Sequence, residues 1–271
     1  MTLRTLTSSC GTLVLVIAGL LAGPARADFN IPNVPLASRP PAAPLVMLIA
    51  SKDHRLFYEA YNDASDIDGD GVLDIRFRPG ITYLGLFDPG TCYSHNGLQD
   101  NTGLFTPATA ASGANRTCAG QWSGNWLNYV TTSRIDALRV VLYGGMREVD
   151  TASSTILRRA YIPQDGHSWA KEYTSAAVDG YRIQDYTPLD PPQEGRRHFF
   201  GNLTANYLSA CNTLSFCSNQ PPWLSIVTNS TVRVWDWASS ERPVLNDDTH
   251  AGTRSNRTVR VLACASGFQA G

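Results

Sequence analysis

The stretch Trp126-Leu-Asn-Tyr-Val-Thr-Thr-Ser-Arg-Ile-Asp-Ala-Leu-Arg-Val-Val-Leu142 decides the fold class, because its apolar residues recur at helical spacing. Gly144 and Gly145 follow it, and glycine is typical of a helix C-terminus. Upstream, Leu45-Val-Met-Leu-Ile-Ala50 is a continuous apolar run, as in a strand that is buried on both faces. We therefore predict an α/β fold in which one long amphipathic helix, Trp126 to Leu142, packs on a sheet that contains Leu45 to Ala50.

Shorter apolar segments on both sides of this helix indicate further strands. The candidates are Ile75 to Pro79, Ile81 to Phe87, Leu224 to Thr228, Thr231 to Trp237 and Thr258 to Cys264. Within the helical region, Trp122 and Trp126 lie four residues apart, so both are expected to face the core.

The segment Asp66-Ile-Asp68-Gly69-Asp70-Gly71-Val72-Leu-Asp74 predicts a calcium site. Its carboxylates stand at positions 1, 3, 5 and 9 of a D-x-D-x-D-G loop, the spacing that gathers oxygen ligands around one hard cation. The glycine at position 6 permits the sharp turn, and the residue at position 7, Val72, would offer its backbone carbonyl. The expected ligands are therefore Asp66, Asp68, Asp70, Val72 and Asp74.

This loop differs from a full EF-hand. Phe77 occupies position 12, where a bidentate Glu belongs, so we expect weak affinity, in the range of about 10⁻⁴ to 10⁻³ M seen in extracellular modules. The alternative interpretation is a solvated acidic turn that binds no ion.

The N-terminus has the three parts of a secretory signal peptide. Arg4 supplies the positive charge, Leu13 to Leu21 is the apolar region, and Ala25-Arg26-Ala27 is a cleavage site of A-x-A type. We predict a signal peptide over residues 1–27, a linker over 28–44, a domain over 45–264 and a tail over 265–271. No segment after the signal is long and apolar enough to predict a membrane span.

The net charge and the number of cysteines further limit the class of protein. A net charge of −1 argues against a general nucleic-acid binder. Cys10 leaves with the signal, so an odd number of cysteines remains, and an exported protein is expected to form disulfides. Cys92 with Cys118 would clamp a segment rich in Gly, Ser and Thr. The pairing of Cys211, Cys217 and Cys264 stays open.

Several ordered motifs together resemble the N-terminal region of the PilC/PilY family of type IV pilus tip-associated proteins from Gram-negative bacteria. They include Trp122-Ser-Gly-Asn-Trp126-Leu-Asn128, Arg134-Ile-Asp136-Ala-Leu-Arg139, Tyr83-Leu-Gly-Leu-Phe87-Asp88, Arg159-Ala-Tyr161-Ile162-Pro163, Phe200-Gly-Asn-Leu203-Thr204 and Trp235-Asp-Trp237. The likeness covers most of residues 45 to 264.

The resemblance implies an exported, non-catalytic protein that supports pilus assembly, adhesion and twitching motility. Its place would be the periplasm, the outer surface or the pilus tip, and its partners minor pilins, the tip or a host or surface ligand. It also implies a degenerate von Willebrand A-like sheet with packed helices and long insertions. The D-x-S-x-S metal motif of such domains is absent, because Ser51-Lys52-Asp53-His54 follows the first apolar run. The chain reaches Gly271 before the β-propeller of longer family members.

Two other classes compete with this interpretation. An enzyme would need a catalytic motif, and the sequence has no G-x-S-x-G, H-E-x-x-H or Walker loop. Asp53-His54 is better explained as a surface pair or a helix cap. A stand-alone secreted module could bind carbohydrate or protein through its Trp and Tyr side chains, and an inactive truncated remnant is the last alternative. The sequons at Asn115, Asn202, Asn229 and Asn256 are expected to be chance matches in a bacterial protein.

Overall fold

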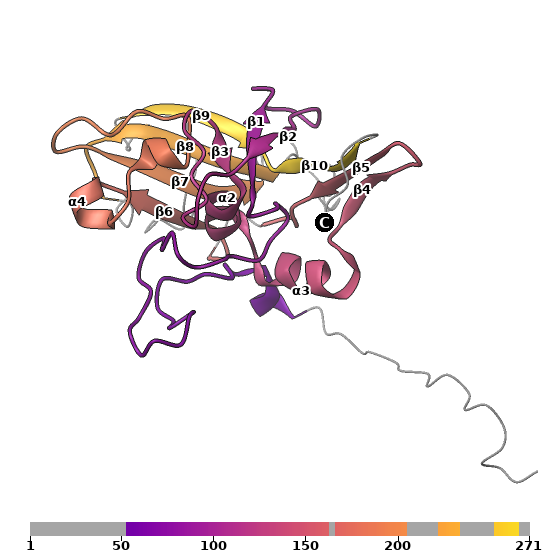
Figure 1. The fold of residues 1–271 in the computed structure, drawn as a ribbon, viewed down its shortest axis with the longest axis horizontal. Coiled ribbons are helices and arrows are strands. Elements are labelled where there is room, and N and C mark those ends of the chain that lie inside the picture. Colours follow the sequence, from indigo (N-terminus) through magenta and orange to yellow (C-terminus); the bar gives the residue numbers. More distant parts are fainter. Residues whose placement is uncertain (1–52, 163–165, 205–221, 234–251, 266–271) are drawn as a thin grey trace, which may run out of the picture. The chain divides into compact units, whose positions relative to one another are not determined.

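Two β-sheets organise the computed structural model, which describes residues 53–162, 166–204, 222–233 and 252–265 (Figure 1). In the described ranges the first sheet has six strands in the order β3-β1-β2-β10-β5-β4, and the second has four in the order β6-β7-β8-β9. The first sheet contains β1 (Thr91–His95), β2 (Phe105–Ala110), β3 (Trp122–Ser123), β4 (Arg147–Asp150), β5 (Ser154–Arg158) and β10 (Arg260–Ala265). The second contains β6 (Trp169–Tyr173), β7 (Arg197–Thr204), β8 (Pro222–Ser230) and β9 (Thr253–Thr258).

The strand pairs of both sheets are antiparallel apart from β2 and β10, which run parallel and meet at Phe105 and Val261. Val259 alone separates β9 from β10, so the chain passes from one sheet to the other within a single residue. The mixed α/β class that we predicted is confirmed, whereas the von Willebrand A-like arrangement is not. Residues 45–50, the expected central strand, lie outside the described residues.

The predicted continuous helix is wrong, because two helices occupy this region. They are α2 (Gly124–Thr131) and α3 (Arg134–Tyr143), separated by Thr132 and Ser133 in extended conformation. At this break, backbone groups of residues 132–134 form hydrogen bonds with residues 58–60. Ala60 N donates to Thr132 O at 3.0 Å, and Arg134 N donates to Tyr58 O at 3.0 Å. Ser133 then caps the second helix, since its Oγ accepts a hydrogen bond from the Asp136 amide.

The two helices are buried to different extents. All residues of α2 are buried, including Trp126, and Trp122 just before it is buried too, as predicted. Helix α3 buries only Ile135 and Asp136. It ends at Gly144, whose φ of 81° is the left-handed conformation that favours glycine, so the predicted C-terminus is confirmed. The other helices in the described ranges are η2 (His54–Phe57), α4 (Ala176–Asp179) and η3 (Ile183–Asp185).

Two of the predicted strands are wrong. Residues 75–79 and 81–87 form no strand, and the second segment is instead held by side chains of α2. Asn125 Oδ1 accepts from Tyr83 N at 2.9 Å, and Asn128 Oδ1 accepts from Phe87 N at 3.0 Å. Asn128 also donates to the carbonyl oxygens of Tyr83 and Phe87. These buried amides provide the hydrogen bonds that a neighbouring strand would have provided.

The downstream strands agree better with the prediction. The segment Leu224 to Thr228 lies within β8, and Thr258 to Cys264 spans the end of β9 and most of β10. Thr231 to Arg233 lie beyond the end of β8, and residues 234–237 are outside the described residues.

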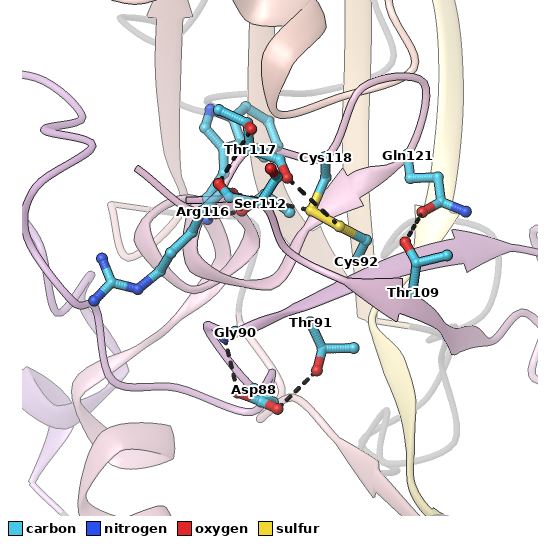
Figure 2. Close-up of a disulfide and its surroundings, with 12 residues drawn as sticks. Asp88, Gly90, Thr91, Cys92, Thr109, Ser112, Arg116, Thr117, Cys118 and Gln121 are labelled. Carbon is cyan, nitrogen blue, oxygen red and sulfur yellow. Dashed lines mark hydrogen bonds between the residues drawn. A yellow bond between two sulfur atoms is a disulfide. The ribbon is translucent and has the colours of Figure 1, made fainter. Parts of the chain in front are cut away.

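The predicted disulfide between Cys92 and Cys118 is confirmed (Figure 2). It joins β1 to the turn before β3, with a Cα–Cα distance of 5.5 Å. Between the two cysteines, the backbones of Ser112 and Thr117 exchange hydrogen bonds of 2.9 and 3.0 Å and close the loop. Cys211 and Cys217 lie outside the described residues, and only the backbone of Cys264 is described, in β10.

Candidate functional site

The acidic loop of residues 66–74 is the candidate site, and the fold brings three of its carboxylates together. Oxygen atoms of Asp66, Asp68 and Asp74 lie within 4.8 Å of one another. Asp74 is only 5% exposed, whereas Asp66 and Asp68 face solvent. Asp70 is outside this group of three, because its Oδ1 accepts a hydrogen bond from Val72 N at 2.7 Å.

The loop owes its curvature to the first carboxylate. Asp66 accepts hydrogen bonds from the amides of Gly69, Asp70 and Gly71 at 2.7, 3.1 and 2.9 Å. Gly69 and Gly71 have φ angles of 78° and 86°, which a residue with a side chain adopts only with strain. The backbone therefore wraps around Asp66, as a cation-binding loop requires.

Hydrogen bonds join the C-terminal end of the loop to its N-terminal end. Asp74 N donates to Ser65 O at 2.9 Å, and Ile67 N donates to Asp74 Oδ2 at 2.8 Å. Arg78 Nε lies 3.5 Å from Asp74 Oδ1 and offsets part of the negative charge. A divalent cation would offset the remaining repulsion among the exposed carboxylates. The three carboxylates are hard oxygen donors of the kind that calcium prefers, and Asp70 would have to leave its hydrogen bond with Val72 N to join them.

A buried ion network anchors the chain immediately before the loop. Lys171 on β6 places its Nζ 2.9 Å from Glu59 Oε2 and 2.8 Å from Asp63 Oδ2. The same ammonium group lies 4.9 Å from the centre of the Tyr129 ring, a cation–π contact. Burial raises the pKa of Glu59, and the charge of Lys171 acts in the opposite direction. No sequence motif indicated this network, because its members lie far apart along the chain.

Two of the histidines are structural. His95 packs against Phe105 and its Nε2 is 3.2 Å from Thr258 O; burial lowers the pKa of His95 to about 4. Burial also lowers the pKa of His198, which accepts a hydrogen bond from Asn229 N. Asp53 Oδ1 accepts from Arg55 N at 2.8 Å and caps η2, so the predicted helix cap is confirmed.

The tryptophans give little support to carbohydrate binding. Trp122, Trp126 and Trp169 are buried, and Trp223 donates its Nε1 proton to Gln99 O. A groove of about 930 Å³ lies beside Tyr83, Phe87, Tyr93 and the end of α3, and none of the described tryptophans lines it. Trp235 and Trp237 lie outside the described residues.

Two sequons fall on buried asparagines. Asn202 is fully buried and donates to Val130 O, and Asn256 is 8% exposed. In the folded chain, neither side chain is open to a glycan.

These features define a mixed α/β domain with a disulfide-closed loop and an acidic surface loop. A family model described as "PilY1 homolog, small alpha/beta domain" matches residues 74–222. The chain therefore belongs to the PilY1 homolog family, as its motifs indicated.

Two relatives from Xylella fastidiosa (strain Temecula1) carry the name "Type IV pilus biogenesis factor PilY1 homolog". The first is 49% identical over 227 residues, which cover 83% of this chain and 14% of the relative. The second is 40% identical over 117 residues, which cover 41% of this chain and 9% of the relative. The chain thus spans a small part of the length of these relatives. No solved structure matches it.

None of the described helices is long and apolar enough to cross a membrane.

Proposed function

We propose that this chain is a non-catalytic module that supports type IV pilus assembly and surface adhesion outside the cytoplasm. The observation that carries the proposal is its 49% identity, over 83% of its length, to a protein named as a type IV pilus biogenesis factor. The disulfide between Cys92 and Cys118 fits an oxidising compartment such as the periplasm or the cell surface. The partners would be minor pilins, the pilus tip or a surface ligand.

Calcium would act in this module as a structural staple. Asp66, Asp68, Asp70 and Asp74, with the carbonyl of Val72, would hold it and would fix the loop between the network of Lys171 and the core residue Phe77. Support comes from the carboxylate spacing, from the group of three oxygens within 4.8 Å and from the left-handed glycines. The ion supplies charge neutralisation, which favours one loop conformation.

The test of the pilus role is a gene deletion in a strain that also lacks any longer paralogue. We expect fewer surface pili, measured as pilin in the sheared fraction, and smaller twitching zones, with both restored by a plasmid copy. A complementing copy with Cys92→Ser and Cys118→Ser should restore less than the parent copy. Full piliation, attachment and twitching in the deletion strain would reject the proposal.

The calcium role is tested separately by thermal unfolding of chelated protein. Millimolar calcium should raise the Tm by about 1–6 °C, since an ion that binds only the folded state stabilises it by mass action. The double variant Asp68→Ala with Asp70→Ala should lose this increase, while Asp150→Asn, an exposed carboxylate elsewhere, should keep it. Absence of a calcium response in the parent protein would reject calcium without affecting the pilus proposal.

A further inference from the structure

Two histidines that are 113 positions apart in sequence meet at the surface. His54 opens η2, and His167 lies in the segment before β6. His54 Nδ1 is 3.4 Å from His167 Nε2, and the ring centres are 5.6 Å apart with the planes nearly perpendicular. His54 is well exposed, so the pair is open to solvent.

The separation of the two nitrogens matches that of two ligands on one metal ion. Imidazole nitrogens bind zinc at 2.0–2.1 Å, so two of them at a tetrahedral angle lie about 3.3 Å apart. The same two nitrogens are within hydrogen-bond distance of each other, and a bound ion would replace this contact.

Neighbouring side chains hold both rings in place. Tyr58 stacks on His167 with ring centres 4.8 Å apart and planes 27° apart, and its edge faces His54. The guanidinium of Arg134 lies 6.0 Å from the centre of the Tyr58 ring on the side of α3. The ligand nitrogens are therefore positioned before any ion arrives, which reduces the cost of ordering them.

The carboxylate of Asp53 lies near the His54 ring. Asp53 Oδ1 lies 3.9 Å from His54 Nε2 and is itself fixed by the hydrogen bond from Arg55 N. This separation is too long for a hydrogen bond, so Asp53 places negative charge beside the ring without fixing its tautomer. That negative charge favours a cation at His54.

We propose that His54 and His167 bind one divalent transition cation of the zinc, copper or nickel type, with water in the remaining positions. Imidazole suits these cations, whereas calcium prefers oxygen, so this site is chemically distinct from the acidic loop. A bound ion would link η2 directly to the segment before β6. This inference is independent of the proposed pilus role and of calcium.

The experiment is calorimetric titration of ZnCl₂ into the full chain without an affinity tag, in chelator-stripped buffer. We expect one zinc per chain, and at least tenfold weaker binding in His54→Ala and in His167→Gln. The matched control is Asp150→Asn, an exposed carboxylate outside both proposed sites, which should leave zinc affinity unchanged. An acidic-loop variant, Asp66→Asn with Asp68→Asn, tests that loop as the rival zinc site. His54 is exposed, so its variant is expected to fold with a normal Tm.

A second measurement identifies the ligands. Cu²⁺ bound to the parent protein should show nitrogen hyperfine coupling in its electron paramagnetic resonance spectrum, and His54→Ala should weaken that coupling. The proposal is overturned if the parent binds no zinc at 1 mM, or if both histidine variants bind zinc as tightly as the parent. It is also overturned if the acidic-loop variant is the one that loses zinc.

Discussion

The acidic loop of residues 66–74 and the neighbouring segment of residues 81–90 are both irregular, but they are stabilised in opposite ways. The acidic loop lies largely in solvent and satisfies its amides with its own carboxylates, mainly Asp66. The second segment buries Tyr83 and Phe87, and receives its hydrogen bonds from Asn125 and Asn128 on α2. Irregular backbone can thus be held by hydrogen bonds to side chains of the loop itself or to buried side chains of a neighbouring helix.

This difference has energetic consequences. A polar group buried without a partner destabilises the fold by about 1–3 kcal/mol, whereas an exposed amide can bond to water instead. Gly85 adds to the constraint, because a side chain there would collide with Asn128 and Thr132. The segment of residues 81–90 is therefore expected to be far more sensitive to substitution than the acidic loop.

The largest effect is expected from Asn128→Ala. It removes hydrogen bonds to Phe87 N, Phe87 O and Tyr83 O inside the core, so the free energy of unfolding should fall by about 4 kcal/mol. Asn96→Ala is the matched control: Asn96 likewise makes three hydrogen bonds to the backbone but is exposed, so its replacement should lower the free energy of unfolding by less than about 1 kcal/mol. Urea unfolding measures both, and equal losses would contradict the comparison.

The second-largest fall in the free energy of unfolding is expected from Lys171→Met, which leaves Glu59 and Asp63 without their buried cation. We expect a loss of about 3–4 kcal/mol at pH 7. Burial already raises the pKa of Glu59, so ionising this group opposes folding as the pH rises above 4.5. Without Lys171 that pKa rises further, and the loss should be smaller at pH 4 than at pH 7. Arg147→Met, at an ion pair with Asp150 in which both side chains are exposed, is the control, and a loss independent of pH would contradict this account.

A comparable loss is expected from Cys92→Ser with Cys118→Ser. The disulfide spans a sequence separation of 26, and closing a loop of this size stabilises the fold by about 3.5 kcal/mol. The loop also contacts the segment of residues 81–90, since Arg116 donates to Thr82 Oγ1. Unfolding is measured with and without reductant, and the double variant should lose less stability on reduction than the parent does.

The smallest effect is expected in the acidic loop itself. Without calcium, Asp66→Ala with Asp68→Ala should reduce the free energy of unfolding by less than about 1 kcal/mol, because the affected amides can bond to water. The difference from the parent should widen when calcium is added. A loss in chelator as large as that of Asn128→Ala would show that the two segments are stabilised alike.

Local patterns in the sequence predicted several parts of the fold. The helical spacing around Trp126, the glycine that ends α3 and the strand within Leu224 to Thr228 depend on neighbouring residues, and they are confirmed. The break before α3 had a local signal as well, because Ser133 and Asp136 have the spacing of an N-terminal cap.

The parts that could not be predicted depend on distant contacts. The alternating segment of residues 81–87 looked like a strand, but its hydrogen-bond partners are asparagines 41–45 positions later. At the candidate site, the carboxylate spacing predicted that Asp66, Asp68, Asp70 and Asp74 gather with the Val72 carbonyl, and the structure groups the carboxylates of Asp66, Asp68 and Asp74. The network of Lys171 and the pairing of His54 with His167 arise only once β6 and the segment before it meet residues from the start of the domain.

The position of β10 has a consequence for the timing of folding. This last described strand lies between β2 and β5 in the six-stranded sheet, although it follows both of them in sequence by more than a hundred positions. Until residues 260–265 reach the compartment in which the chain folds, β2 and β5 have no strand between them, and their exposed edges can pair with other chains. During export the six-stranded sheet would therefore stay open until almost all of the described chain has crossed the membrane.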